Sequence, residues 1–348
     1  MTDVLRVDPE HPDPTLIARA AEMLERGKLV AFPTETVYGL GVHALDRAAV
    51  QRLFEAKHRP SNDPLIVHVA SIDDVPRLVE SVPLSARALA ARFWPGPLTL
   101  VLRRSPRVPA EVSAGLPTVA IRVPSHPIAR ALLEASRLPI AAPSANLFSR
   151  PSPTQAAHVL ADLDGRIDLI LDGGPTTVGV ESTVVDLSVT PPAVLRPGAI
   201  DLDALRATIP DVVARDARGS AEEATPSPGM LAKHYSPRAP LTLYDGDRAT
   251  ALAHLLRDIR GHVERGTTVA ALAFTEDARE LRHTGARIVE LGSESDPDTV
   301  AARLYAALRE ADATRPDLIV ARTLTTAHPL TAAVRDRLGR AAGRVIDT

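Results

Sequence analysis

The chain has 348 residues, enough for two domains of ordinary size, and its 45% hydrophobic and 24% charged residues are typical of a globular protein. A net charge of −3 argues against a surface devoted to nucleic acid, and the lack of cysteine excludes disulfides, thiol nucleophiles and cysteine-ligated zinc. Residues 1–14 are acidic and broken by prolines, and no apolar run approaches the roughly 20 residues of a membrane span. We therefore expect a cytoplasmic protein without a membrane segment.

Residues 1–208 alternate between helix-like and strand-like segments. Helices are expected at 15–26, 46–55, 84–94, 126–137 and 153–163. Strands are expected at 29–32, 64–70, 98–102, 118–123, 168–171, 183–187 and 193–195. Because the last strands follow one another without a helix between them, the pattern predicts an α/β domain with a mixed, twisted sheet.

The periodic pattern stops between residues 209 and 237, where the small, polar and acidic stretch 217–228 is typical of a linker. After Pro240 the alternation returns and is regular. Strands are expected at 241–244, 269–274, 288–291 and 318–321, and helices at 250–264, 299–310 and 330–341. The second part is thus predicted to be a smaller Rossmann-like domain with a parallel sheet. The expected division is 1–208, 209–237 and 238–348.

The first motif, P-T-E-T-V-Y-G-L-G at 33–41, follows the strand at 29–32. Its polar groups would therefore stand at the carboxyl end of a strand, where ligands bind in α/β folds, and its glycines permit close approach of the backbone. The alternative is an ordinary strand-to-helix turn.

Cations follow. Lys57 and Arg59 leave a helix end and enter a proline-fixed loop, a pairing that suits phosphate, although Lys-x-Arg by itself is typical of a solvated helix end. His68 lies in the next strand and is by itself more typical of a core residue. Arg122 stands in an apolar strand and needs an anionic partner, either a structural salt bridge or a ligand such as an amino-acid carboxylate.

The remaining motifs are A-A-P-S-A-N at 141–146, S-P-T at 152–154, G-V-E-S-T-V-V-D at 179–186 with L-R-P-G at 195–198, and P-G-M-L-A-K-H-Y-S-P at 228–237. Small hydroxyl residues after a strand and at a helix start suit phosphate oxygens. The His-Tyr pair at the end of the linker suits a lid. No P-loop and no G-x-G-x-x-G motif is present, so a nucleotide would be bound by another design.

Taken together and in this order, these segments resemble the Sua5/YrdC/YciO family, and the linker with the second domain resembles its longer Sua5 type. The resemblance implies an L-threonylcarbamoyladenylate synthase, a nucleotidyltransferase that joins L-threonine, bicarbonate or CO₂, and ATP, and releases pyrophosphate. It also implies that the product passes to the machinery that modifies adenosine 37 of tRNA, and it leaves direct tRNA binding open. Mg²⁺ would accompany ATP without protein ligands of its own.

The resemblance also implies roles for individual residues. Threonine would be held by Thr36, His68, Arg122, Ala142 and Ser182, with Arg122 on its carboxylate. ATP would be held by Lys57, Arg59, Asp63, Thr118, Ser144, Asn146, Ser152, Arg196 and His234, and Lys57 and Arg59 are the candidate catalytic residues. His58 and Asp63 stand where members of the family often have Gly and Asn. An acid beside phosphates is unfavourable unless it contacts the ribose, the base or a metal.

Two other functions fit parts of the sequence. An RNA-binding module without chemistry would use a basic concave face, here Arg52, Lys57, Arg59, Arg103 and Arg104, but the net charge and the 3% content of aromatic residues argue against it. A carbamoyl-transfer domain of hydrogenase maturation would add acylphosphatase and zinc-finger segments, which this chain lacks. The second domain carries no catalytic motif, and we expect it to stabilise the lid or to restrict access to the pocket.

Overall fold

The computed structural model describes residues 1–215, 225, 227 and 234–348, and within them the chain forms two compact units. The first unit comprises Met1–Phe148, Ser152–Thr177 and Glu181–Ala232, and the second comprises Ser149–Pro151, Val178–Val180 and Lys233–Thr348. Most of the expected linker at 217–228 lies outside the described residues. No helix in the described part of the chain is long and apolar enough to cross a membrane.

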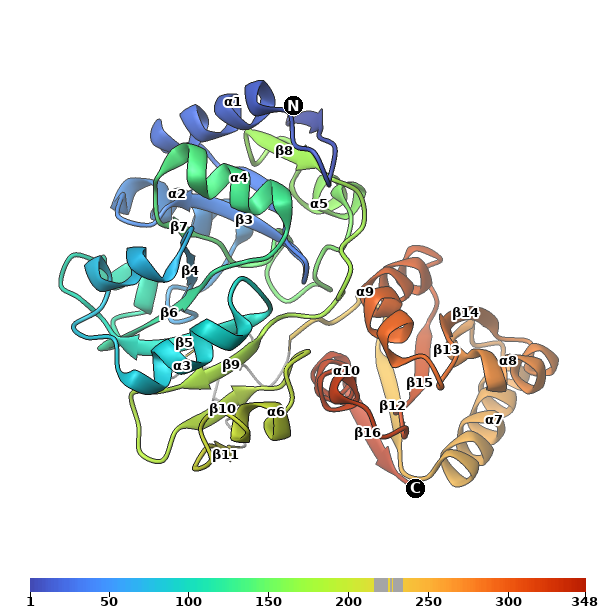
Figure 1. Ribbon diagram of the computed structural model, residues 1–348. Helices are drawn as coiled ribbons and strands as arrows, with labels where there is room; N and C mark the ends of the chain where they lie inside the picture. Colours follow the sequence, from blue (N-terminus) through green and yellow to red (C-terminus); the bar gives the residue numbers. More distant parts are fainter. Residues whose placement is uncertain (216–224, 226, 228–233) are drawn as a thin grey trace. The chain divides into compact units, whose positions relative to one another are not determined.

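The first unit contains the expected α/β elements (Figure 1). Its helices are α1 (Pro14–Glu25), α2 (Arg47–Lys57), α3 (Leu84–Phe93), α4 (Pro127–Ser136), α5 (Ala156–Leu163) and α6 (Leu202–Arg206), with short 3₁₀ turns η1 (Ile72–Arg77) and η2 (Ala110–Ser113). Its strands are β1 (Asp3–Arg6), β2 (Val30–Pro33), β3 (Tyr38–His43), β4 (Ile66–His68), β5 (Leu98–Arg103), β6 (Thr118–Arg122), β7 (Ile140–Ala141), β8 (Leu169–Asp172), β9 (Thr183–Asp186), β10 (Ala193–Arg196) and β11 (Val213–Ala214).

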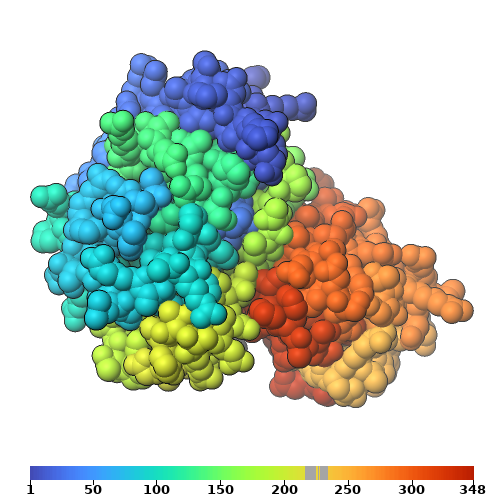
Figure 2. Space-filling view, in the orientation of Figure 1, coloured from blue at the N-terminus to red at the C-terminus, as the bar shows by residue number. Residues whose placement is uncertain are grey.

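Among the described residues these strands form one sheet in the order β1-β8-β2-β3-β7-β4-β6-β5-β9-β10-β11. The sheet contains both parallel pairs, such as β4–β6, and antiparallel pairs, such as β2–β3, so the predicted mixed sheet is confirmed. Side chains alternate between the two faces of a strand, and each face has its own apolar core. Helices α1 and α4 lie side by side, as the blue and green surfaces of Figure 2 show. They pack on one face of the sheet together with strand residues such as Phe32. Helices α2, α3 and α5 cover the other face, where Val67 and Ile121 are buried.

The first motif does not form the strand-to-helix turn that was its alternative reading. Residues 34–37 join β2 to β3 as the tip of an antiparallel hairpin in which Phe32 pairs with Gly39. Strand β3 was not predicted, because glycines at 39 and 41 interrupt its apolar residues and lower its strand propensity. An added Cβ at Gly41 would lie 2.8 Å from side-chain atoms of both Ile140 and Phe32, so packing in this sheet requires the glycine.

Helix α2 ends at Lys57, the first of the predicted cations, Arg59 follows two residues later, and both ends of the helix are fixed by local chemistry. The Asp46 carboxylate accepts hydrogen bonds from the N–H groups of Ala48 and Ala49 at its start. His58 ends the helix with a φ of 52°, a left-handed conformation that glycine adopts without strain. This left-handed conformation accounts for the glycine that the family resemblance leads one to expect at the position of His58. Its Nε2 accepts a hydrogen bond from the Arg166 guanidinium at 2.7 Å.

The second unit is a doubly wound domain, and its strand pairs in the described part of the chain are all parallel, as predicted. Its strands are β12 (Leu241–Asp245), β13 (Val269–Phe274), β14 (Arg287–Gly292), β15 (Leu318–Arg322) and β16 (Arg344–Asp347), in the order β14-β13-β15-β12-β16. Its helices are α7 (Arg248–Glu264), α8 (Thr275–Leu281), α9 (Pro297–Ala313) and α10 (Pro329–Ala341), with a short 3₁₀ turn η3 (Arg282–Thr284). The Arg322 guanidinium, buried at the end of β15, is paired with Asp277 and Glu294.

Strands β9 and β10 meet the segment that follows them at a point where only glycine fits. An added Cβ at Gly198 would lie 2.3 Å from the backbone nitrogen of Thr183 and 2.6 Å from the carbonyl carbon of Ser182. We therefore expect Gly198→Ala to lower the free energy of unfolding of the first unit by about 3 kcal/mol, the upper range for overpacking. The single tryptophan, Trp94, lies in this unit, so denaturant unfolding followed by its fluorescence measures the change.

Gly165→Ala is the matched control for this prediction. Gly165 has a φ of +72° and no other atom within 4 Å of an added Cβ, so alanine there should cost only the left-handed backbone strain of about 1 kcal/mol. Equal losses in the two variants would contradict the steric explanation at Gly198.

Candidate functional site

A row of polar side chains crosses the middle of the first sheet on the face that carries α1 and α4. His68 of β4 pairs with Arg122 of β6, and Arg122 pairs with Thr99 of β5, so all three project from the same face. Apolar clusters lie to either side on this face, one around Ile140, the neighbour of His68 on β7, and one around Val184. His68, Arg122 and Thr99 are each at most 3% exposed. Since buried polar groups require partners, their contacts define what the row can do.

Arg122 is held by three different segments of the chain. Its Nη2 lies 2.7 Å from Glu35 Oε1 in an ion pair, its Nη1 donates to Thr36 Oγ1 at 2.9 Å, and its Nε donates to the carbonyl of Gly96 at 3.3 Å. Of the two readings left open by the sequence, the structural salt bridge is therefore present. The ion pair fixes the guanidinium plane before any ligand arrives.

Glu35 carries the charge that makes this arrangement possible. Its second oxygen accepts the N–H of Ser125 at 3.1 Å. Burial by itself raises the pKa of the Glu35 carboxyl, but the charge and hydrogen bonding of Arg122 and the Ser125 N–H outweigh it and hold the pKa below its usual value. Glu35 is therefore ionised when the cluster is intact.

The tip of the β2–β3 hairpin presents Thr36 to this arginine. Thr34 Oγ1 accepts the N–H groups of Thr36 and Val37, donates to the Val37 carbonyl at 2.7 Å, and lies 2.8 Å from Thr36 Oγ1. One threonine thus shapes the turn and the other meets Arg122. The P-T-E-T sequence is explained by these two roles together with that of Glu35.

His68 is neutral at physiological pH. Burial lowers the pKa of His68 to about 3, repulsion from Arg122 adds to this shift, and Glu35 opposes it. Its ring packs edge-on against Phe32, with 6.3 Å between ring centres. In the described part of the chain its Nδ1 has no hydrogen-bond partner. A buried ring nitrogen without a partner next to an arginine is the pattern expected where a ligand completes the site.

Ser182 connects the polar row to a second arginine. Its Oγ lies 2.7 Å from Thr99 Oγ1 and accepts a hydrogen bond from Arg196 Nη2 at 3.1 Å. Arg196 Nε also donates to the Ser182 carbonyl at 3.1 Å. The register between β9 and β10 shifts between Val194 and Arg196, and such a bulge re-aims the side chain that follows it. Both Ser182 and Arg196 are buried, at 0% and 2% exposure.

Lys57 and Arg59 are buried as well, at 1% and 8% exposure, so the reading of a solvated helix end is wrong. Lys57 Nζ donates to the carbonyl of Ser144 at 2.5 Å and to that of Asn146. Burial lowers the pKa of Lys57 well below its usual value and Arg59 adds to this, while Asp63 and Asp162 oppose it. The predicted K-x-R and S-x-N motifs are therefore joined directly in the structure.

Arg59 is enclosed by its own loop. Its Nε donates to the carbonyl of Asp63 at 3.1 Å, its Nη2 donates to that of Pro64 at 2.8 Å, and Nη2 lies 2.8 Å from Asp63 Oδ2. Asp63 has no exposed surface. Burial raises the pKa of Asp63, and the cations Arg59, Lys57 and Arg196 oppose this. The three cations thus all act on the charge of this one carboxylate.

The other predicted site residues are linked less directly to the cluster around Arg122, Ser182 and Arg59. Ala142, buried beside β4, has its N–H bonded to the Ile66 carbonyl at 2.9 Å. Ser152 Oγ donates a hydrogen bond at 2.6 Å to Oε1 of Glu181, the residue that precedes Ser182 in the sequence. Thr118 begins β6, four residues and roughly 13 Å along the strand from Arg122, so both would have to contact different parts of one ligand.

His234, the remaining predicted ATP residue, belongs to the second unit. Its ring packs against Tyr235 with 4.2 Å between centres, and its N–H bonds to the Arg340 carbonyl at 3.1 Å. Its closure on a nucleotide stays a prediction. Residues 228–233, the first part of the motif at 228–237, lie outside the described part of the chain.

Sequence reasoning assigned no role to Glu35, Thr99 and Glu181. Glu35 lies in the motif at 33–41 and Glu181 in the motif at 179–186. A carboxylate within an otherwise buried motif could have indicated their roles, because a buried charge requires a partner. Thr99 lies in an apolar strand outside every motif. Its role follows only from its pairing with Arg122 in the sheet.

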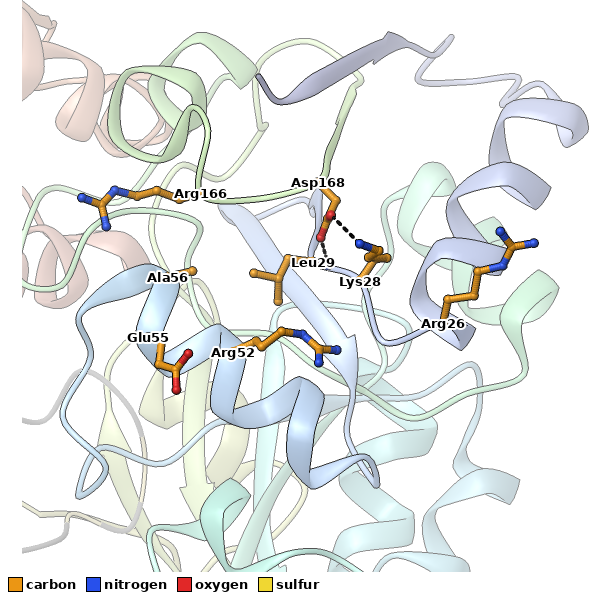
Figure 3. Close-up of a pocket in the computed structure, with 8 residues that line it drawn as sticks. All are labelled: Arg26, Lys28, Leu29, Arg52, Glu55, Ala56, Arg166 and Asp168. Atoms are coloured by element: carbon orange, nitrogen blue, oxygen red, sulfur yellow. Dashed lines mark hydrogen bonds and ion pairs between the residues drawn. The ribbon is translucent and has the colours of Figure 1, made fainter.

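Two surface pockets of the first unit adjoin these elements. One, of about 540 Å³, is lined by Glu35, Ser125, His126 and Thr177 among others, so Glu35 borders the surface there. The other, of about 520 Å³, lies beside α2 (Figure 3). It is lined by Arg26, Lys28, Leu29, Arg52, Glu55, Ala56, Arg166 and Asp168.

The cations of the pocket in Figure 3 do not converge. Lys28 pairs with Asp168 at 3.3 Å, Arg52 donates to the Gly27 carbonyl, and Arg26 extends away from the other side chains. The convergent set of buried groups is instead the one around Arg122, Ser182 and Arg59, which is the candidate site.

Comparisons with known proteins cover both parts of the chain. A family model described as "Telomere recombination", for Sua5, YciO and YrdC, matches residues 22–198, and one described as "Threonylcarbamoyl-AMP synthase, C-terminal domain" matches residues 200–343. The chain is 44% identical to the threonylcarbamoyl-AMP synthase of Pyrococcus abyssi, over 93% of each chain. It is 45% identical to that of Bacillus subtilis, over 95% of this chain and 94% of the relative. A crystal structure of P. abyssi Sua5 complexed with L-threonine matches with a TM-score of 0.92 at 42% identity, covering 100% of both chains.

The Arg122–Glu35 pair makes a prediction about stability. Glu35→Gln leaves a buried guanidinium without its counter-charge, so we expect the free energy of unfolding of the first unit to fall by about 3 kcal/mol. Glu111→Gln is the control, since its 3.8 Å ion pair with Arg47 is exposed and should contribute less than about 0.5 kcal/mol. Denaturant unfolding followed by Trp94 fluorescence measures both, and equal losses would refute a structural role for the buried pair.

The pKa of His68 predicts how stability depends on pH. Its folded value of about 3 is below the ordinary 6.5, so between these values the unfolded chain binds the extra proton. The contribution of neutral His68 is therefore complete above about pH 6.5 and is lost as the pH falls toward 3. As the pH falls from 6.5 toward 3, we therefore expect the free energy of unfolding of the wild-type chain to fall more than that of His68→Gln. A difference that stays constant between pH 7 and 4 would contradict the assignment.

Proposed function

Since the chain belongs to the Sua5-type family of threonylcarbamoyl-AMP synthases and is an enzyme, we propose that the buried polar cluster is its active site. There L-threonine, bicarbonate or CO₂, and ATP would give L-threonylcarbamoyladenylate and pyrophosphate, which makes the enzyme a nucleotidyltransferase. The single observation that carries the proposal is a connected set of buried cations: Arg196 contacts Ser182, which is linked through Thr99 to Arg122, and Arg59 is paired with Asp63, on whose charge Lys57 and Arg196 also act. Anionic substrates are what such a cluster attracts.

Threonine would bind at the polar row. Its carboxylate would meet Arg122, whose guanidinium is already oriented by Glu35 and Thr36. Neutral His68 and the Ser182 hydroxyl offer hydrogen-bonding groups for the amine and the side-chain hydroxyl. A neutral imidazole matters here because a second cation beside Arg122 would repel the threonine ammonium and compete for its carboxylate.

The reaction balances without a protein nucleophile. The ammonium of threonine loses a proton to water, the resulting amine bonds to the carbon of CO₂, and a second proton leaves the nitrogen for water, which gives an N-carboxylate. One of its oxygens attacks the α-phosphorus of ATP, the bond from this phosphorus to the bridging oxygen of the β-phosphate breaks, and pyrophosphate leaves with the electron pair. Lys57, Arg59 and Arg196 would stabilise the charge that develops on the phosphates. Catalysis would then rest on positioning and electrostatics.

Mg²⁺ would enter with ATP rather than reside on the protein. In the described residues no group of three or more His, Asp or Glu side chains could hold a metal ion. Near the predicted phosphate site the carboxylate of Asp63 lies among three cations, which disfavours a divalent ion. The residues present therefore do not fit a resident Mg²⁺, and the triphosphate and water would carry it.

The RNA-binding alternative loses two of its residues. Lys57 and Arg59 are buried and bonded to backbone carbonyls, so they do not contribute to an exposed basic face. Transfer of the product to the machinery that modifies adenosine 37 of tRNA, with or without direct tRNA contact, remains part of the proposal.

Pyrophosphate release tests the proposed reaction. With ATP, Mg²⁺, bicarbonate and L-threonine we expect release that stops when any one component is omitted. Arg59→Ala should lower kcat/KM for ATP by roughly 100-fold, as removal of one group that stabilises transition-state charge does. Arg47→Ala, which changes an exposed arginine at the start of α2, should leave it unchanged. Release that needs neither threonine nor bicarbonate would overturn the proposal.

A further inference from the structure

The Asp63 carboxylate is a buried charged group for which the proposed reaction has no use. It has no exposed surface, and in the described part of the chain neither of its oxygens accepts a hydrogen bond. It forms an ion pair with Arg59 Nη2 at 2.8 Å, without the alignment of a hydrogen bond. A buried carboxylate that is so poorly bonded is costly, so its charge needs a reason beyond local structure.

The surroundings of Asp63 are cationic. Arg59, Lys57 and Arg196 all act on its carboxyl group, and each of the three is buried. Without Asp63 the three cations would face one another in a region of low dielectric constant, where repulsion is large. The carboxylate therefore stabilises the empty site.

The same carboxylate occupies the arginine that phosphate would use. Arg59 donates to the carbonyl groups of Asp63 and Pro64, and its Nη2 is paired with the Asp63 side chain. A phosphate arriving at Arg59 would enter a site that already holds a negative charge of the same kind. Ligand anion and carboxylate thus compete for one set of cations.

We propose that Asp63 is a positioning residue that acts as an internal competitor for phosphate: it holds Arg59 in the empty site and weakens the binding of pyrophosphate so that this product can leave. The inference rests on the proposed function, because pyrophosphate is a product only of that reaction. Asp63 then contacts neither ribose nor base, and it acts through Arg59. An asparagine at this position would keep the shape of the side chain and lose the competition.

Direct binding measurements test this inference apart from the reaction. Isothermal titration calorimetry of the full chain with pyrophosphate should show Asp63→Asn binding at least about tenfold more tightly than wild type, because a negative charge has been removed from within a few ångströms of the ligand. Adenosine, which carries no charge, should bind both proteins equally. Pyrophosphate binding that is unchanged or weaker in Asp63→Asn, or an equal change for adenosine, would overturn the proposal.

Two further variants separate charge from structure. Asp63→Glu keeps the negative charge and should not tighten pyrophosphate binding. Asp186→Asn removes another buried carboxylate, one whose Oδ1 is bonded to Ser188, and should leave pyrophosphate binding as in wild type. Tightening by Asp63→Glu, or by Asp186→Asn to the same extent as by Asp63→Asn, would also overturn the proposal.

Turnover supplies a readout that a structural role would not change in the same way. In Asp63→Asn we expect the KM for ATP to fall and inhibition by added pyrophosphate to strengthen at least about tenfold, while kcat falls if product release limits the rate. Loss of kcat with unchanged inhibition by pyrophosphate would count against the proposal. If wild type bound pyrophosphate but released none from ATP, the proposed reaction would fail while the calorimetric test of competition would still stand.

Discussion

The ion pair between Arg122 and Glu35 is the interaction on which the candidate site depends. An arginine in the middle of a sheet, flanked on its own face by apolar clusters, is tolerated only when its charge is matched nearby. Glu35 supplies the charge from the tip of a hairpin, and the same carboxylate binds the N–H of Ser125 after β6. One pair therefore fixes the hairpin, the central strand and the segment leading to α4. Because Thr36 follows Glu35, its hydroxyl is brought to the same guanidinium.

The second constraint is that the cations of the site are satisfied by the protein itself. Lys57 is bonded to carbonyl oxygens of the 144–146 loop, Arg59 to those of its own loop, and Arg196 to the carbonyl of Ser182. A carbonyl oxygen is a weaker partner for a cation than a phosphate oxygen, because it carries only a partial charge. These contacts thus hold the cations in place and still yield to an anionic ligand. Such a site is organised before its ligand arrives, which is what catalysis by electrostatic stabilisation needs.

Periodicity in the sequence was enough to predict both sheets and most helices, because their apolar residues repeat at the spacing of the element. It missed β1, β7, β11, β16, α6 and α8, which are short or exposed at many positions, and β3, whose apolar residues are separated by glycines. Of the site, the motif residues that follow strands were found because their polar groups stand at places where α/β folds bind ligands. Thr99 and the partnership of Glu35 with Arg122 were not found. Both depend on strand register and on a hairpin that brings together residues far apart in the chain, and neither can be read from local spacing.

The acids of the site explain how it can exist without a ligand. Glu35 is paired with Arg122, and Asp63 is paired with Arg59. Glu181, the residue before Ser182, accepts a hydrogen bond from the hydroxyl of Ser152. Four buried cations without these acids would repel one another in a region from which water is largely excluded. The carboxylates are not equivalent, however. Glu35 is ionised, accepts the N–H of Ser125 through Oε2, and orients Arg122 through its ion pair whether or not threonine is bound. Asp63 accepts no hydrogen bond and shares the cations that phosphate needs. The first kind of acid raises the precision of a binding site, while the second lowers its affinity, so the balance between substrate capture and product release in this chain is set by its carboxylates as much as by its lysine and arginines.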